Sequence, residues 1–88
     1  MRVRKGLILR RVDGMPIVVP IGEAAKAFNG MIRLNETGAF LWEKLTVGAD
    51  REALVSALVE AYAVSVTEAE ADVDAFLHPL QRVGFLEE

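Results

Sequence analysis

The N-terminal third of the chain has the apolar pattern of three short strands. Two apolar runs, Leu7–Val12 and Met15–Pro20, are separated only by Asp13-Gly14. This pair favours a two-residue type I′ hairpin turn, which needs positive φ at both central positions. A third strand is predicted at Gly30–Leu34, after a connector at 21–29 that has room for one helical turn.

The rest of the chain has the periodicity of three helices. Asn35 is expected to cap the first helix, which runs to about Leu45, and Asp50 the second. Thr67–Glu70 reads as a capping box for the third helix, which Gly84 ends. The apolar residues that share helix faces are Leu41, Trp42 and Leu45; Leu54, Val55, Leu58, Val59 and Tyr62; and Val73, Phe76, Leu77, Leu80 and Val83.

Pro79 interrupts the third helical pattern, because a proline removes one helix hydrogen bond and crowds the carbonyl four residues earlier. A kink or a break into two segments is therefore expected near residues 75–79. The order of elements predicts an α+β, winged-helix-like fold: a three-stranded antiparallel sheet followed by three helices. Eighty-eight residues are the length of one domain, here residues 1–88.

Charge divides the chain into two halves of opposite sign. Residues 1–44 hold eight Lys/Arg and four Asp/Glu, whereas residues 45–88 hold two Arg and nine Asp/Glu. Cysteine is absent, which excludes a disulfide scaffold, an iron–sulfur cluster and a cysteine zinc site within these residues. The apolar runs are too short for a signal peptide or a membrane span, and a cytoplasmic location fits.

No set of side chains suggests catalysis. His78 is the only histidine and has no Asp, His or Cys at metal-ligand spacing, and Thr37 has no base beside it. Glu70, Asp72 and Asp74 are spaced around a helix rather than paired on one face, so solubility and the helix dipole explain them. The sequence predicts a protein that is not an enzyme and carries no metal or cofactor.

Two motifs carry a family resemblance. The first is Leu34-Asn35-Glu36-Thr37-Gly38-Ala39-Phe40-Leu41-Trp42. The second is the tail, with Thr67-Glu68-Ala69-Glu70, Asp72-Val73-Asp74-Ala75-Phe76-Leu77, Leu80 and Gly84-Phe85-Leu86. In order and spacing they resemble the PqqD-like proteins, also called RiPP recognition elements, over about residues 5–87.

The resemblance implies a peptide chaperone. Proteins of this family bind the leader segment of a ribosomally made precursor peptide, which adds as an extra strand to the third strand, in a groove completed by the third helix. Carried over to this chain, the strand positions are Met31, Ile32, Arg33 and Leu34, and the groove-side helix positions are Val73, Asp74, Leu77 and Gln81. From alternation alone, we expect Ile32 and Leu34 to face the core and Met31 and Arg33 to be partly exposed.

The implied partners are the leader peptide and a separate modifying enzyme, often a radical S-adenosylmethionine enzyme in this family. Such an enzyme needs cluster-binding cysteines that this chain lacks. We expect a monomer or weak dimer that binds neither membrane nor nucleic acid. The alternative is a winged-helix nucleic-acid-binding regulator, but its recognition helix should be basic, and here the third helix is acidic.

Overall fold

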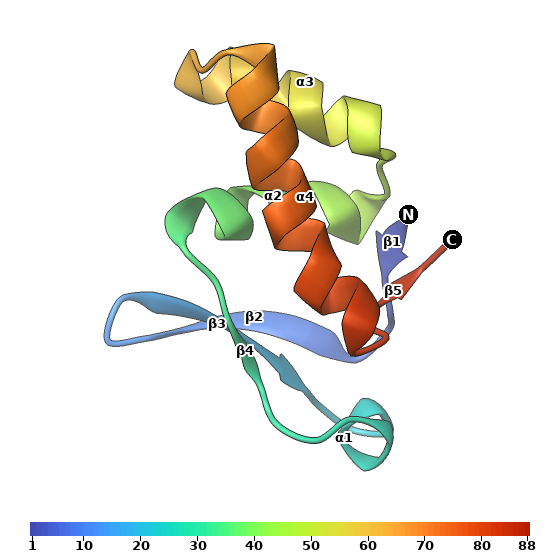
Figure 1. The fold of residues 1–88 in the computed structure, drawn as a ribbon. Coiled ribbons are helices and arrows are strands. Elements are labelled where there is room, and N and C mark those ends of the chain that lie inside the picture. The colour runs from blue at the N-terminus through green and yellow to red at the C-terminus, as the bar shows by residue number, and fades with distance from the viewer.

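The computed structural model describes residues 1–88, and Figure 1 shows the order of its elements. The strands and helices are β1 (Arg2–Val3), β2 (Leu7–Val12), β3 (Met15–Pro20), α1 (Ala24–Ala27), β4 (Ile32–Arg33), α2 (Glu36–Val47), α3 (Arg51–Tyr62), α4 (Val66–Arg82) and β5 (Leu86–Glu87). Strands β2, β3 and β4 form a three-stranded antiparallel sheet in that order. The predicted α+β class is confirmed, and the expected single turn in the connector is α1.

The hairpin forms as the Asp-Gly pair predicts. Val12 pairs with Met15 across the turn, and Asp13 and Gly14 both have positive φ, 52° and 80°. These are the signs that a type I′ turn requires, and its twist matches that of the two flanking strands. The turn therefore fixes the register of β2 against β3.

Strand β4 is shorter than the predicted Gly30–Leu34. Arg33 pairs with Ile17 and Ile32 with Val18, and the Leu34 amide donates to the Pro16 carbonyl at 2.9 Å. Pro16 has no amide to return a bond to Leu34, which ends the ladder on that side. Met31 and Leu34 continue the path of the chain beyond the paired residues, so the segment keeps the predicted position at the sheet edge.

Two of the three helix caps are confirmed, and the third is wrong. The Asn35 side chain accepts from Gly38 N, and the Asp50 side chain accepts from Ala53 N. Helix α4, however, begins at Val66 with Ser65 as its N-cap: Ser65 Oγ accepts from Glu68 N and donates to Glu68 Oε1, each at 3.1 Å. Starting before Thr67 adds the backbone bond from Ala69 N to Ser65 O, which lengthens the helix.

Helix α4 passes through Pro79 as one helix, so the expected break into two segments is wrong. Proline removes only the bond that would have reached the Ala75 carbonyl. Phe76, Leu77 and Leu80 are buried on both sides of that point. Because packing of an apolar face supplies most of a helix's stability in a protein, one lost hydrogen bond so near the end does not interrupt it.

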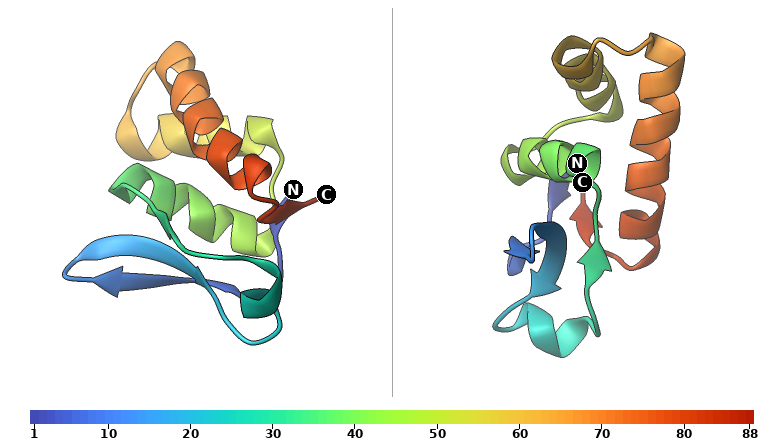
Figure 2. Two further views of the ribbon diagram at one scale, coloured as in Figure 1. Left: turned by 60° about the horizontal axis from the view of Figure 1, so that its bottom comes forward. Right: turned by 90° about the vertical axis from the view of Figure 1, so that its left-hand side faces the viewer.

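The core lies between one face of the sheet and the helices. Figure 2 shows the three long helices on the same side of the sheet, with nothing covering the opposite side. The largest fully buried side chains come from both layers: Val18 from the sheet, and Trp42, Leu41, Leu45, Leu54, Leu58, Val73 and Leu80 from the helices. A two-stranded ribbon that the sequence analysis did not predict, β1 with β5, joins the two ends of the chain.

Candidate functional site

Strand β4 leaves a row of backbone groups open at the sheet edge. Ile32 and Leu34 direct their polar backbone groups toward β3, as the bond from Leu34 N to Pro16 O shows. Successive residues of an antiparallel strand direct these groups in opposite directions. The N–H and C=O groups of Met31 and Arg33 therefore point away from the sheet, where no further strand follows β4. Such an edge is a template for pairing with another extended chain.

A hollow lies beside this edge, between β4, the start of α2 and the side of α4. Its volume is about 230 Å³. The residues that line it are Ile32, Arg33, Leu34 and Asn35, then Thr37 and Gly38 of α2, and Asp72, Ala75, Phe76 and Pro79 of α4. Open backbone groups thus adjoin a groove with a mixed polar and apolar lining, which has room for side chains of an added strand.

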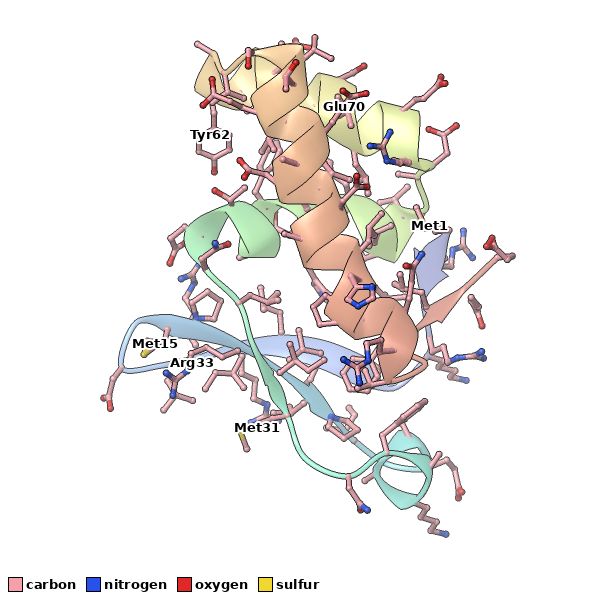
Figure 3. The ribbon with its side chains drawn as sticks, in the orientation of Figure 1. Met1, Met15, Met31, Arg33, Tyr62 and Glu70 are labelled. Atoms are coloured by element: carbon pink, nitrogen blue, oxygen red, sulfur yellow. The ribbon has the colours of Figure 1, made fainter.

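The four predicted strand residues alternate as expected. Ile32 and Leu34 are half-buried and pack against the core, whereas Met31 is 63% exposed and Arg33 is also exposed. Figure 3 shows the Met31 and Arg33 side chains on the side of β4 away from α4. Ile32 and Leu34 therefore face the groove and the core, and Arg33 borders the hollow through its backbone.

The structure does not bring the four predicted helix residues to this groove. Val73 and Leu77 are buried in the core, at 0% and 5% exposure. Asp74 binds Arg51 of α3. Asp74, Leu77 and Gln81 together line a different hollow, which Arg51 and Met1 also line. A helix turns by about 100° per residue, so residues one or two positions apart on α4 border different hollows.

The α4 residues at the groove are Asp72, Ala75, Phe76 and Pro79 instead. Their spacing of three, four and seven residues defines one helix face. From the sequence, Phe76 was expected in the core, Pro79 at a kink or break of the helix, and Asp72 as a solvated acid. The sequence does contain a signal for this face. These residues lie beside the buried face of Val73, Leu77 and Leu80, and the residues that flank a buried helix face contact the neighbouring element.

Gly38 and Asn35 lie at the end of the groove where β4 leads into α2. Asn35 Oδ1 accepts from Gly38 N at 2.7 Å and closes the first turn of α2. A Cβ at Gly38 would lie 3.3 Å from Leu34 Cβ and 3.1 Å from Asn35 Oδ1. Glycine therefore lets Leu34, at the end of the edge strand, pack directly on the first turn of α2.

One ion pair supports this arrangement from the sheet. Arg11 of β2 donates to both carboxylate oxygens of Glu36, at 2.8 and 2.9 Å. The hydrogen bond from Arg11 holds the pKa of the Glu36 carboxyl below its ordinary value. Because Glu36 is the first residue of α2, the pair ties the hairpin to the point where β4 leads into the helix.

Few of the side chains that line the groove carry titratable groups. No three His, Cys, Asp or Glu side chains lie close enough together to hold a metal ion. Thr37 and Asp72 line the groove, but no hydrogen bond joins them and no histidine lines it with them. None of the helices is both long enough and apolar enough to cross a lipid bilayer. The groove presents main-chain donors and acceptors together with polar and apolar side chains.

Comparison with known proteins gives one family match and two solved structures of similar fold. The family model described as coenzyme PQQ synthesis protein D (PqqD) matches residues 17–86. Two solved structures share the fold, each 22% identical to the chain and covering 99% of it. One is TbiB1 in complex with the TbiA(beta) leader peptide, with a TM-score of 0.75 and 95% of that chain covered. The other is lasso peptide synthetase B1 complexed with the leader peptide, with a TM-score of 0.72 and 96% covered. No curated protein sequence matches the chain.

Proposed function

The chain belongs to the PqqD family, and on that premise we propose that it is a non-catalytic peptide chaperone. It binds the leader of a ribosomally made precursor peptide by strand addition along β4. It then presents the remainder of that peptide to a modifying enzyme. The observation that carries the proposal is the open edge of β4 next to the groove formed with α4.

Strand addition uses both parts of this site. Main-chain hydrogen bonds to the outward groups of Met31 and Arg33 supply affinity with little dependence on sequence. Alternate side chains of the added strand enter the groove over Ile32, Leu34 and Phe76 and supply specificity. Micromolar binding, about −8 kcal/mol, is a reasonable expectation for such a short pairing.

The two proteins of the same fold support the proposal by what they bind, because each is described in complex with a leader peptide. The modifying enzyme is a separate protein in this proposal, and a radical S-adenosylmethionine enzyme is our choice of class. Such an enzyme holds its cluster through cysteines, and these 88 residues contain none. The domain acts in the cytoplasm as a monomer or weak dimer.

Binding to DNA is less compatible with the surface. A winged-helix regulator presents a basic helix to the phosphate backbone. Helix α4 instead carries Glu68, Glu70, Asp72 and Asp74 and ends in a single arginine, Arg82. Phosphate repulsion along this helix opposes docking in a groove of duplex DNA.

The test is a titration of isotopically labelled protein with the leader segment of a candidate precursor peptide. Amide shifts should be largest at residues 30–34 and along the groove side of α4, and α3 around Leu54–Val59 should stay quiet. Arg33→Pro removes the outward amide and keeps the inward bond of Leu34, so it should abolish binding, while Arg33→Ala should retain most of it. Largest shifts on α3, or full affinity in Arg33→Pro, would refute strand addition.

A further inference from the structure

Asp72 is the acid of α4 that has no partner. Of the other three acids in this helix, Glu68 is bonded to the N-cap Ser65, and Glu70 and Asp74 both lie against Arg51. Asp72 makes no side-chain hydrogen bond or ion pair, is exposed, and lines the groove beside β4. The Arg33 side chain points away from α4 (Figure 3), and Asp72 is the one acidic residue among those that line the groove.

A bound strand would change the surroundings of this carboxylate. In the free protein it is solvated, but a peptide lying between β4 and α4 removes part of that water. An ionised carboxylate that loses water needs a cation or hydrogen-bond donors in return. The first turn of α2 adjoins it and favours negative charge, yet its Gly38 amide already has Asn35 as acceptor. A second carboxylate there would meet the charge of Asp72 at short range.

The groove also fixes the distance between a peptide residue opposite Asp72 and a peptide residue opposite Phe76. Helix α4 runs antiparallel to β4 (Figure 1), and Asp72 and Phe76 both line the groove between them. Asp72 and Phe76 are four helix residues apart, which is about 6 Å along the axis. Two strand residues span about 6.6 Å and point to the same face. A peptide strand therefore places residues two apart opposite Asp72 and Phe76.

We propose that the leader recognised by this chain carries a lysine or arginine that pairs with Asp72, and an apolar residue two positions away that packs on Phe76. The inference rests on the proposed strand addition at β4 and adds the chemical class of the peptide. Asp72 thus determines the specificity of the site, and the open backbone of β4 supplies affinity that is independent of sequence.

The experiment is selection from a displayed library of random 16-residue peptides against three proteins: wild type, Asp72→Lys and Glu52→Lys. Glu52 is exposed on α3 and lines a different hollow, between α3 and α4, so its reversal is the matched control for net charge. Selected peptides are retested against Arg33→Pro, and only those that lose binding there count as groove-bound. Each variant is first checked for an unchanged melting temperature.

Groove-bound peptides from wild type and Glu52→Lys should share a Lys or Arg two positions from an apolar residue, and Asp72→Lys should select Asp or Glu at that position instead. Changing the cation to Glu in one synthetic peptide should weaken wild-type binding about tenfold and strengthen binding to Asp72→Lys. If the groove-bound peptides show no preference for Lys or Arg, or if wild type selects Asp or Glu at that position, the inference about Asp72 is wrong. The strand-addition model would not be affected by that result. If no selected peptide is sensitive to Arg33→Pro, the proposed function itself fails.

Discussion

Arg51 and Asp74 form a two-point ion pair that joins α3 to α4. Arg51 Nε donates to Asp74 Oδ1 at 2.8 Å and Nη2 donates to Oδ2 at 2.9 Å, and Glu70 lies 3.8 Å from the same guanidinium. Asp72 is only two residues away, yet it faces the groove beside β4, because two residues turn a helix side chain by about 200°. Neighbouring acids of one helix thus have different roles: Asp74 fixes helix packing, and Asp72 is free for a ligand.

Asp74→Asn should flatten the acid limb of the pH–stability curve. The hydrogen bond from Arg51 lowers the pKa of the Asp74 carboxyl from its ordinary 3.8. A group with a lowered folded-state pKa stabilises the protein above its unfolded-state pKa, and this contribution is lost as pH falls through the folded-state value. Urea unfolding of wild type and variant, from neutral pH to below 3.8, measures the difference. Because the pair is exposed, added salt should shrink the effect; identical curves at low salt would contradict this role.

Leu77→Ala should destabilise the fold, and Gln81→Ala should not. Leu77 is 5% exposed and belongs to the central core cluster, so truncating it leaves a cavity and costs about 2–5 kcal/mol. Gln81 is exposed one turn further along α4. Denaturant unfolding measures both values. If the Leu77→Ala protein is as stable as wild type but binds peptide poorly, Leu77 contacts the peptide, as the sequence predicted.

Ser65→Ala should weaken the start of α4 by about 1 kcal/mol, the usual effect of removing an N-cap hydroxyl. The hydroxyl satisfies the Glu68 amide at 3.1 Å, and no other side chain does so. Thr67→Ala is the matched control, because Thr67 lies inside the first turn and its side chain makes no hydrogen bond. Thermal unfolding distinguishes the two. A larger loss of stability in Thr67→Ala than in Ser65→Ala would show that Thr67 is the N-cap, as the sequence pattern suggested.

Local chemistry made much of this fold predictable. The Asp13-Gly14 turn, the Asn35 and Asp50 caps and the buried stripe of α2 each depend on residues within a few positions of one another. The end of β4 was less predictable, because it depends on Pro16, a residue of the neighbouring strand. The start of α4 was ambiguous for a different reason: Ser65 and Thr67 each precede a glutamate by three residues, so two caps compete within the same segment.

The sequence did not predict which residues of α4 face the groove. The helix has one buried stripe through Val73, Leu77 and Leu80, and periodicity locates this stripe well. Which flank of it faces β4 and which faces α3 depends on the rotation of the helix against both neighbours. The β1–β5 ribbon was also beyond reach, since two paired residues at each end of the chain leave no periodic signal.

Filling the groove should abolish peptide binding without disturbing the core. Ala75 is exposed and lines this hollow as well as the one that Leu77 and Gln81 border. An indole at Ala75→Trp that turns toward β4 would occupy part of the hollow's volume of about 230 Å³. Leader affinity should fall at least about tenfold, measured by anisotropy of a labelled peptide, with the melting temperature unchanged. Ala61→Trp, on the exposed surface of α3, adds the same ring away from the groove and should bind as wild type does. Wild-type affinity in Ala75→Trp would place the peptide elsewhere. Loss in both variants would show that the added indole acts through the protein as a whole rather than by filling the groove.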